Sequence, residues 1–124
     1  MLSEPEDADH LLLGCVVARQ LWFALLSPLG LASIQASTEE TVIQWWLRSR
    51  GSLPMDSRPM FDAVTFLISW SIWKERNSRT FNGVIRSFRD LVFAVLHEAE
   101  VWVSAGFLPL GEALTSWSYL SAAL

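Results

Sequence analysis

The stretch from Met60 to Trp73, MFDAVTFLISWSIW, constrains the fold most, because it is apolar on two sides at helical spacing. One stripe consists of Phe61, Val64, Ile68 and Ile72, and a second, nearly opposite stripe consists of Phe66, Trp70 and Trp73. A helix with two apolar faces is normally packed on both sides. The spacing therefore predicts a central core helix over 59–81, with Pro59 in its first turn. Before Lys74 the stretch covers about 14 residues, fewer than the roughly 20 that a membrane span requires.

The same spacing predicts three further helices, over 10–27, 38–50 and 87–105. The clearest stripe is that of the last segment, formed by Phe88, Leu91, Val92, Val95, Ala99, Trp102 and Val103. Ser37 with Glu40, and Ser87 with Asp90, have the spacing of a capping box at a helix start. The tail after Gly106 has a weaker pattern and is a candidate fifth helix. Since no segment alternates like a strand, we expect an all-α bundle of four helices, or five.

Length and composition indicate one folded domain over 1–124, preceded within it by an acidic segment, 1–9, that we expect to be flexible. Hydrophobic residues make up 52% of the chain, and seven of its residues are tryptophan. Large aromatic side chains left exposed would make an adhesive surface. We therefore assign the core to a set of tryptophans on the helical stripes: Trp22, Trp70, Trp73 and Trp102.

Charge and cysteine content narrow the function classes. The net charge of −4 argues against a dedicated nucleic-acid coat, although it allows a local basic patch. A single cysteine, Cys15, excludes an intrachain disulfide and indicates a reducing, intracellular compartment, either nuclear or cytoplasmic. The two histidines have no serine or cysteine at a catalytic spacing, and the glycines form no phosphate loop. We predict that the protein is not an enzyme.

One pair of residues has the chemistry of a metal half-site. The segment HLLLGC places His10 five residues before Cys15. Imidazole and thiolate both bind zinc, but a closed structural site takes four ligands. The alternative is that Cys15 is a small buried side chain on its helical stripe. With two candidate ligands only, we expect no closed zinc site.

The central helix ends in KERNSR, which concentrates cations and amides. Its candidate phosphate ligands are Lys74, Arg76, Asn77 and Arg79. Trp73 and Phe81 lie close in sequence and could stack on bases. The alternative is structural, because arginines and asparagine at a helix C-terminus also satisfy its unpaired carbonyl groups.

Two motifs carry a resemblance to a known family. The first is His10-Leu-Leu-Leu-Gly-Cys15, and the second is Trp70-Ser-Ile-Trp-Lys-Glu-Arg-Asn-Ser-Arg-Thr-Phe81. Together they resemble the zinc-binding region at the C-terminal end of plant LINE-type (non-LTR) retrotransposon reverse transcriptases, over about residues 6–107. The family's zinc motif opens with a Cys-x-x-Cys that this sequence lacks. In that family, the resemblance implies a region that binds zinc and assists nucleic-acid engagement beside a polymerase. For this sequence, it implies a truncated remnant in which neither role is intact.

Two function hypotheses follow. In the first, the chain is a non-catalytic remnant of a retroelement reverse transcriptase and associates weakly with single-stranded RNA or DNA. In the second, it is a free-standing helical module that contacts another protein, or itself, through exposed aromatic residues. A positive patch around Arg76, Arg79, Arg86 and Arg89 would favour the first hypothesis. A broad exposed tryptophan surface would favour the second.

Overall fold

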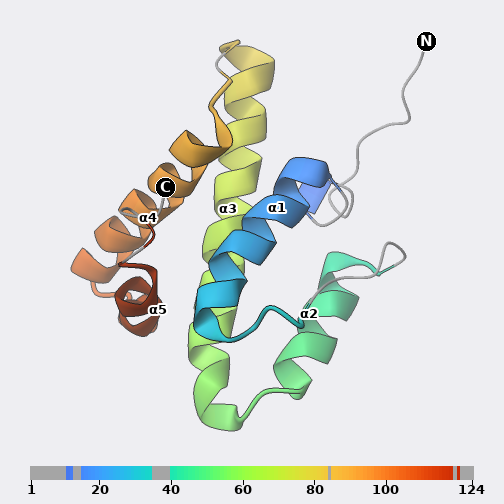
Figure 1. Cartoon of the computed structure of the whole chain (residues 1–124), viewed down its shortest axis with the longest axis vertical. Coiled ribbons are helices and arrows are strands. Elements are labelled where there is room, and N and C mark those ends of the chain that lie inside the picture. Colours follow the sequence, from blue (N-terminus) through green and yellow to red (C-terminus); the bar gives the residue numbers. More distant parts are fainter. Residues whose placement is uncertain (1–10, 13–14, 35–39, 84, 119, 121–124) are drawn as a thin grey trace.

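The computed structural model describes residues 11–12, 15–34, 40–83, 85–118 and 120, and within them the chain forms five α-helices and no strand (Figure 1). The helices are α1 (Val16–Leu26), α2 (Val42–Gly51), α3 (Arg58–Phe81), α4 (Phe88–Ser104) and α5 (Leu110–Trp117). Short 3₁₀ turns, η2 (Ser27–Leu29) and η3 (Met55–Ser57), follow α1 and precede α3. The prediction of an all-α bundle is confirmed, and the tail after Gly106 supplies the fifth helix.

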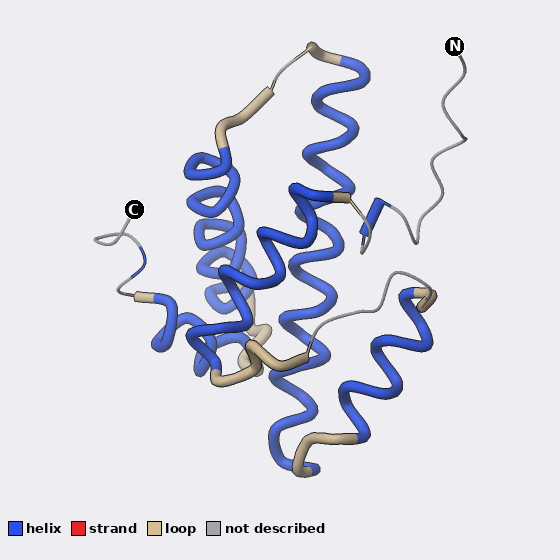
Figure 2. The backbone as a smooth tube through the Cα atoms, turned by 45° about the vertical axis from the view of Figure 1, so that its right-hand side comes forward, coloured by secondary structure: helices blue, strands red, loops and turns tan. Residues whose placement is uncertain are grey.

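Helix α3 is the centre of the bundle and contacts each of the other four helices. Figure 1 shows it running the length of the molecule, with α1 crossing it, α4 and α5 on one side and α2 on the other. Figure 2 shows that α2 meets α3 at one end only and inclines away from it toward the other end. This arrangement leaves one side of α3 without a neighbouring helix along much of its length.

The helix ends follow local chemistry. Helix α3 begins one residue before the predicted start, with Pro59 in the first turn, and it ends at Phe81 as predicted. Gly83 and Gly106, just beyond α3 and α4, have positive φ angles of 67° and 108°, which favour glycine. The Ser87 hydroxyl accepts a hydrogen bond from the Asp90 backbone N–H at 3.1 Å and so caps α4.

The predicted N-terminal ends of α1 and α2 differ from the observed ones. The α2 capping box consists of Thr41 and Gln44, which exchange hydrogen bonds of 3.1 and 3.0 Å, and not of Ser37 and Glu40. Both pairs have the same spacing, but the observed helix starts four residues later, at Val42. Helix α1 starts at Val16, whereas the stripe predicted a start at residue 10. Residues 1–10, the acidic segment among them, and Ser37 lie outside the described residues.

The core lies between α3 and the helices that gather on its Phe61–Ile72 stripe. Trp45 of α2 is at its centre, with its ring 4.8 Å from that of Trp22 and 5.8 Å from that of Phe61. Trp117 of α5 is also fully buried, and its indole Nε1 donates a 2.8 Å hydrogen bond to the Leu25 carbonyl in the last turn of α1. That carbonyl has no partner within its own helix, so the bond both satisfies it and attaches α5 to α1.

The assignment of four tryptophans to the core is correct for Trp22 and wrong for Trp70 and Trp73. Trp22 is buried, Trp102 is half-buried, and Trp70 and Trp73 are 38% and 48% exposed. The reason is the number of neighbours. The side chains of the Phe61–Ile72 stripe are buried, whereas those of the opposite stripe are exposed. Among the described residues, the opposite stripe makes a ring contact with another helix through Phe66, which meets Trp102 of α4.

Candidate functional site

A cluster of exposed and half-buried aromatic side chains runs along one side of α3, onto α4 and onto the segment that follows α4. We call it the aromatic face, and it comprises Phe66, Trp70, Trp73, Trp102 and Phe107. The indoles of Trp70 and Trp73 are stacked, with centroids 5.3 Å apart and planes 20° from parallel. The Trp102 ring meets those of Phe66 and Phe107 edge-on, at 5.7 and 5.8 Å. These ring contacts hold the cluster in place while leaving much of it open to solvent.

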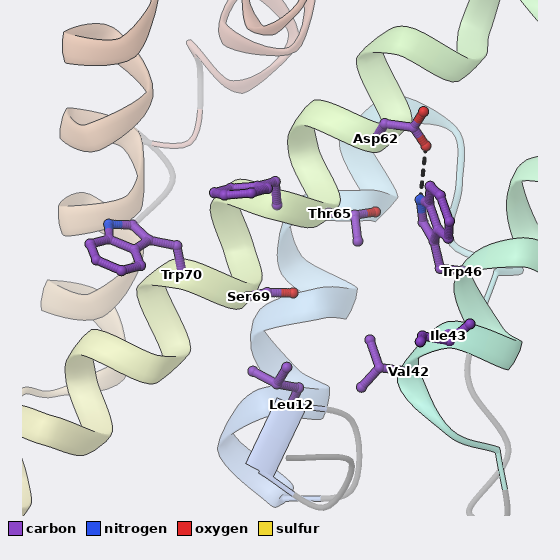
Figure 3. A pocket seen from close by; sticks show the side chains of 9 residues that line it. Leu12, Val42, Ile43, Trp46, Asp62, Thr65, Ser69 and Trp70 are labelled. Atoms are coloured by element: carbon purple, nitrogen blue, oxygen red, sulfur yellow. Dashed lines mark hydrogen bonds between the residues drawn. The ribbon is translucent and has the colours of Figure 1, made fainter.

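A groove lies beside the aromatic face, between α2 and α3 (Figure 3). We call it the α2–α3 groove, and it has a volume of about 490 Å³. Its lining is mostly apolar and consists of Leu12, Val42, Ile43, Trp46, Asp62, Thr65, Phe66, Ser69 and Trp70. Phe66 and Trp70 belong to both features, so the groove and the aromatic face are one continuous apolar surface.

The charges at the edges of this surface occur in pairs. On the groove side, Asp62 accepts two hydrogen bonds from Arg50, at 3.0 and 2.9 Å, and a third from the Trp46 indole at 2.8 Å. The hydrogen bonds to Asp62 raise the pKa of Arg50 above its ordinary value, which favours the charged form of Arg50 in this ion pair.

On the α4 side, the Lys74 ammonium lies 3.5 Å from the Glu98 carboxylate and 5.8 Å from the centre of the Trp70 ring. Glu98 also accepts a hydrogen bond from the Trp102 indole at 3.1 Å. Lys74 is therefore drawn toward α4 and the aromatic ring, where it neutralises an acid. The sequence assigned Lys74 to phosphate binding, and the structure places it in this ion pair instead.

The other three candidate phosphate ligands lie at the end of α3 and point in different directions. At about 100° per residue, Asn77 shares the side of Trp73, whereas Arg79 is turned about 120° away from it. Arg76 donates a hydrogen bond of 3.0 Å to Thr80 on its own helix. Arg79 therefore does not share a face with the exposed indoles, whereas Arg76 is turned by about 60° from Trp73. Phosphate binding by these residues stays a prediction.

Glu75, the acidic residue within KERNSR, binds Arg86 in the segment between α3 and α4. Glu75 is only 7% exposed, and its carboxylate accepts the Arg86 backbone N–H at 3.3 Å and lies 3.9 Å from the Arg86 guanidinium. Arg89, the next cation along the chain, lies over the Phe93 ring at 5.3 Å. With Arg76 bonded to Thr80, at least three of the four arginines that could have formed a positive patch thus have local partners of their own.

Of the two residues of the predicted zinc half-site, the structure describes Cys15. Cys15 is a half-buried free thiol that packs against the core, but it precedes α1, whereas the alternative expected it buried on the helical stripe. His10 lies outside the described residues. Within the described ranges, no three His, Cys, Asp or Glu side chains come close enough to hold a metal ion together. The donor set seen there does not fit a closed zinc site, and the expectation that no such site forms stays a prediction.

Sequence reasoning missed the groove and the exposure of the aromatic face. A signal was present, because Asp62, Ser69 and Asn77 alternate with Phe66, Trp70 and Trp73 on the same side of the α3 helix. Such a mixed side is typical of a solvent-facing surface. Ile43 and Trp46 of α2 also line the groove. No sequence pattern indicates this, because it depends on the angle between α2 and α3.

Fold and site together define the class of the protein as a small five-helix bundle with an exposed aromatic face beside a groove. No protein-family model, no curated protein and no solved structure matches the chain. In the part of the chain that the structure describes, no helix has the length and apolar character to cross a bilayer.

Proposed function

We propose that this chain is a helical interaction module that docks a protein partner on its aromatic face. The observation that carries the proposal is the exposure of Phe66, Trp70 and Trp73 on one side of a single rigid helix. Contiguous exposed aromatic residues beside a groove are typical of protein-binding surfaces, where tryptophan is enriched at the positions that contribute most affinity.

The charges of the described residues support a protein partner over a nucleic acid. Lys74 pairs with Glu98, and Arg50 pairs with Asp62, so two of the cations beside this surface are held by acids and are less available to phosphates. The whole chain repels phosphate at long range, since its net charge is −4. The relation to a retroelement reverse transcriptase remains a proposal about origin, and its zinc and nucleic-acid roles do not enter the proposed function.

Site-specific photo-crosslinking tests the proposal. Benzoylphenylalanine replaces Phe66 in the full chain, and the matched control carries it in place of Phe23, an exposed aromatic residue of α1 outside both features. We expect discrete protein adducts from position 66 that are absent from position 23. The same adducts should disappear when Trp73→Ala is added. Trp73 belongs to the same aromatic face as position 66 and stacks on Trp70, so its loss should weaken docking of the partner there.

A titration with labelled single-stranded RNA at two salt concentrations tests the competing hypothesis. We expect fluorescence anisotropy curves of the wild type and of the Arg76→Ala/Arg79→Ala variant to coincide. Two outcomes together would show that nucleic acid is the ligand and reject the protein-binding proposal. One is that RNase removes the adducts at position 66, and the other is that the salt slope falls by about 1.4 units in the variant, which is about 0.7 for each charge removed.

A further inference from the structure

The aromatic face and the α2–α3 groove place exposed indoles and an apolar recess next to each other. Trp73 stacks on Trp70, which lines the groove, and the Trp73 side chain is 48% exposed on the same surface. Figure 3 shows Asp62, Thr65 and Ser69 of α3 on the side of Trp46, Val42 and Ile43 of α2, with the Trp70 indole at the far edge of the groove, toward α4. The groove volume of about 490 Å³ falls in the range that holds a drug-sized molecule, so one indole side chain fits in it.

A projection and a recess on one surface allow a two-fold symmetric contact. In such a contact, the same patch serves both subunits, and each residue pair across the interface occurs twice. Resting on the proposed function, we infer that the partner is a second copy of this chain. The Trp73 indole of each copy enters the α2–α3 groove of the other copy, against Ile43.

The charges around the surface are compatible with self-association. A two-fold contact brings like groups of the two copies near each other, so a rim with a net charge of one sign would repel itself. Here the rim is paired as Arg50 with Asp62, at 2.9 Å, and Lys74 with Glu98, at 3.5 Å. Two such neutral rims can approach each other, whereas a charged rim would instead select a partner of opposite charge.

The exposed apolar area is of the right size. Phe66, Trp70 and Trp73 are 63%, 38% and 48% exposed, equivalent to about one and a half free aromatic side chains or about 220–370 Å². A standard interface buries about 800 Å² on each partner, of which about 65% is apolar in homodimers. These three aromatic side chains therefore supply about half of the apolar area required. The exposed side chains of Ile43, Leu47 and Phe107 are available to supply the rest.

The decisive experiment exchanges the projection and the recess between two variants of the full chain. Trp73→Ala removes the projection, and Ile43→Trp fills the groove; both positions are well exposed, so circular dichroism should show intact helices. Sedimentation equilibrium over a concentration series measures the mass. We expect the wild type and the control Phe23→Ala to rise from 14.0 kDa toward twice that mass, and each variant alone to remain monomeric.

An equimolar mixture of the two variants should associate again. In the mixed dimer, one contact is that of the wild type, and the other pairs a filled groove with a missing indole. A wild-type mass of 14.0 kDa at every concentration, or a mixture that stays as monomeric as its components, would overturn the inference. If the chain stays monomeric but position 66 still forms adducts with another protein, the proposed function holds with a different partner. If it stays monomeric and forms no such adducts, both the dimer and the proposed function are rejected.

Discussion

The contrast between Trp73→Ala and Trp45→Ala tests whether the aromatic face lies outside the core. Trp45 is 1% exposed and packs on Trp22 and Phe61, so its truncation leaves a cavity and should cost about 3–5 kcal/mol of unfolding free energy. Trp73 is 48% exposed and leaves no enclosed cavity when truncated. The effect of Trp73→Ala should therefore be much the smaller of the two.

The cost of Trp73→Ala follows from the area it covers. About half of the roughly 150–250 Å² of an aromatic side chain, at about 25 cal/mol per Å², gives at most about 2–3 kcal/mol. Residual burial in the unfolded chain reduces this figure to about 1–2 kcal/mol. That loss is small enough for Trp73→Ala to remain folded in the binding experiments.

Urea unfolding followed by far-ultraviolet circular dichroism measures both losses without relying on tryptophan emission. The protein concentration must lie below the onset of association, because binding to a second copy would add to the apparent stability. Equal losses for the two variants, or a larger loss for Trp73→Ala, would show that Trp73 belongs to the core and refute the assignment of an exposed face.

Substitutions at three further positions test the structural account by the same unfolding measurement. Trp117→Phe should cost about 2–3 kcal/mol, because it leaves the buried Leu25 carbonyl unpaired; a loss below about 1 kcal/mol would mean that this bond does not hold α5 in place. Ser87→Ala should cost about 1 kcal/mol through loss of the α4 cap, and Ser87→Asn should restore most of it. Gly30→Ala should cost about 1 kcal/mol because its φ is 78°, although no neighbouring atom blocks the added carbon; an unchanged stability would contradict the left-handed turn after η2.

The helices themselves were predictable because local chemistry determines them. The apolar stripe of α4 and its Ser87 cap predicted 87–105 against an observed Phe88–Ser104. For α1, the apolar stripe predicted a start at residue 10, but the helix starts at Val16. The periodicity of apolar residues does not show where a helix begins. For α2, two polar pairs, Ser37 with Glu40 and Thr41 with Gln44, had the same spacing, and the sequence alone could not choose between them.

The burial of the tryptophans could not be predicted from hydrophobicity. Two apolar stripes on α3 suggested packing on both sides, but burial depends on how many helices reach each side. Trp45, which the prediction left out of the core, is at its centre, while Trp70 and Trp73 remain at the surface. The groove depends on the inclination of α2 to α3, a tertiary property that no local pattern contains.

Hydroxyl-radical footprinting of the tryptophans, read out by mass spectrometry, tests the docking claim most directly. In the dilute purified chain, Trp70 and Trp73 should be oxidised readily, while Trp45 and Trp117 should be protected because they are buried. When the chain is concentrated or held in its complex, Trp70 and Trp73 should become protected, and the exposed control Phe23 should react as before. Protection of Trp70 and Trp73 already in the dilute chain, or equal oxidation in both states, would contradict a docking role for the aromatic face.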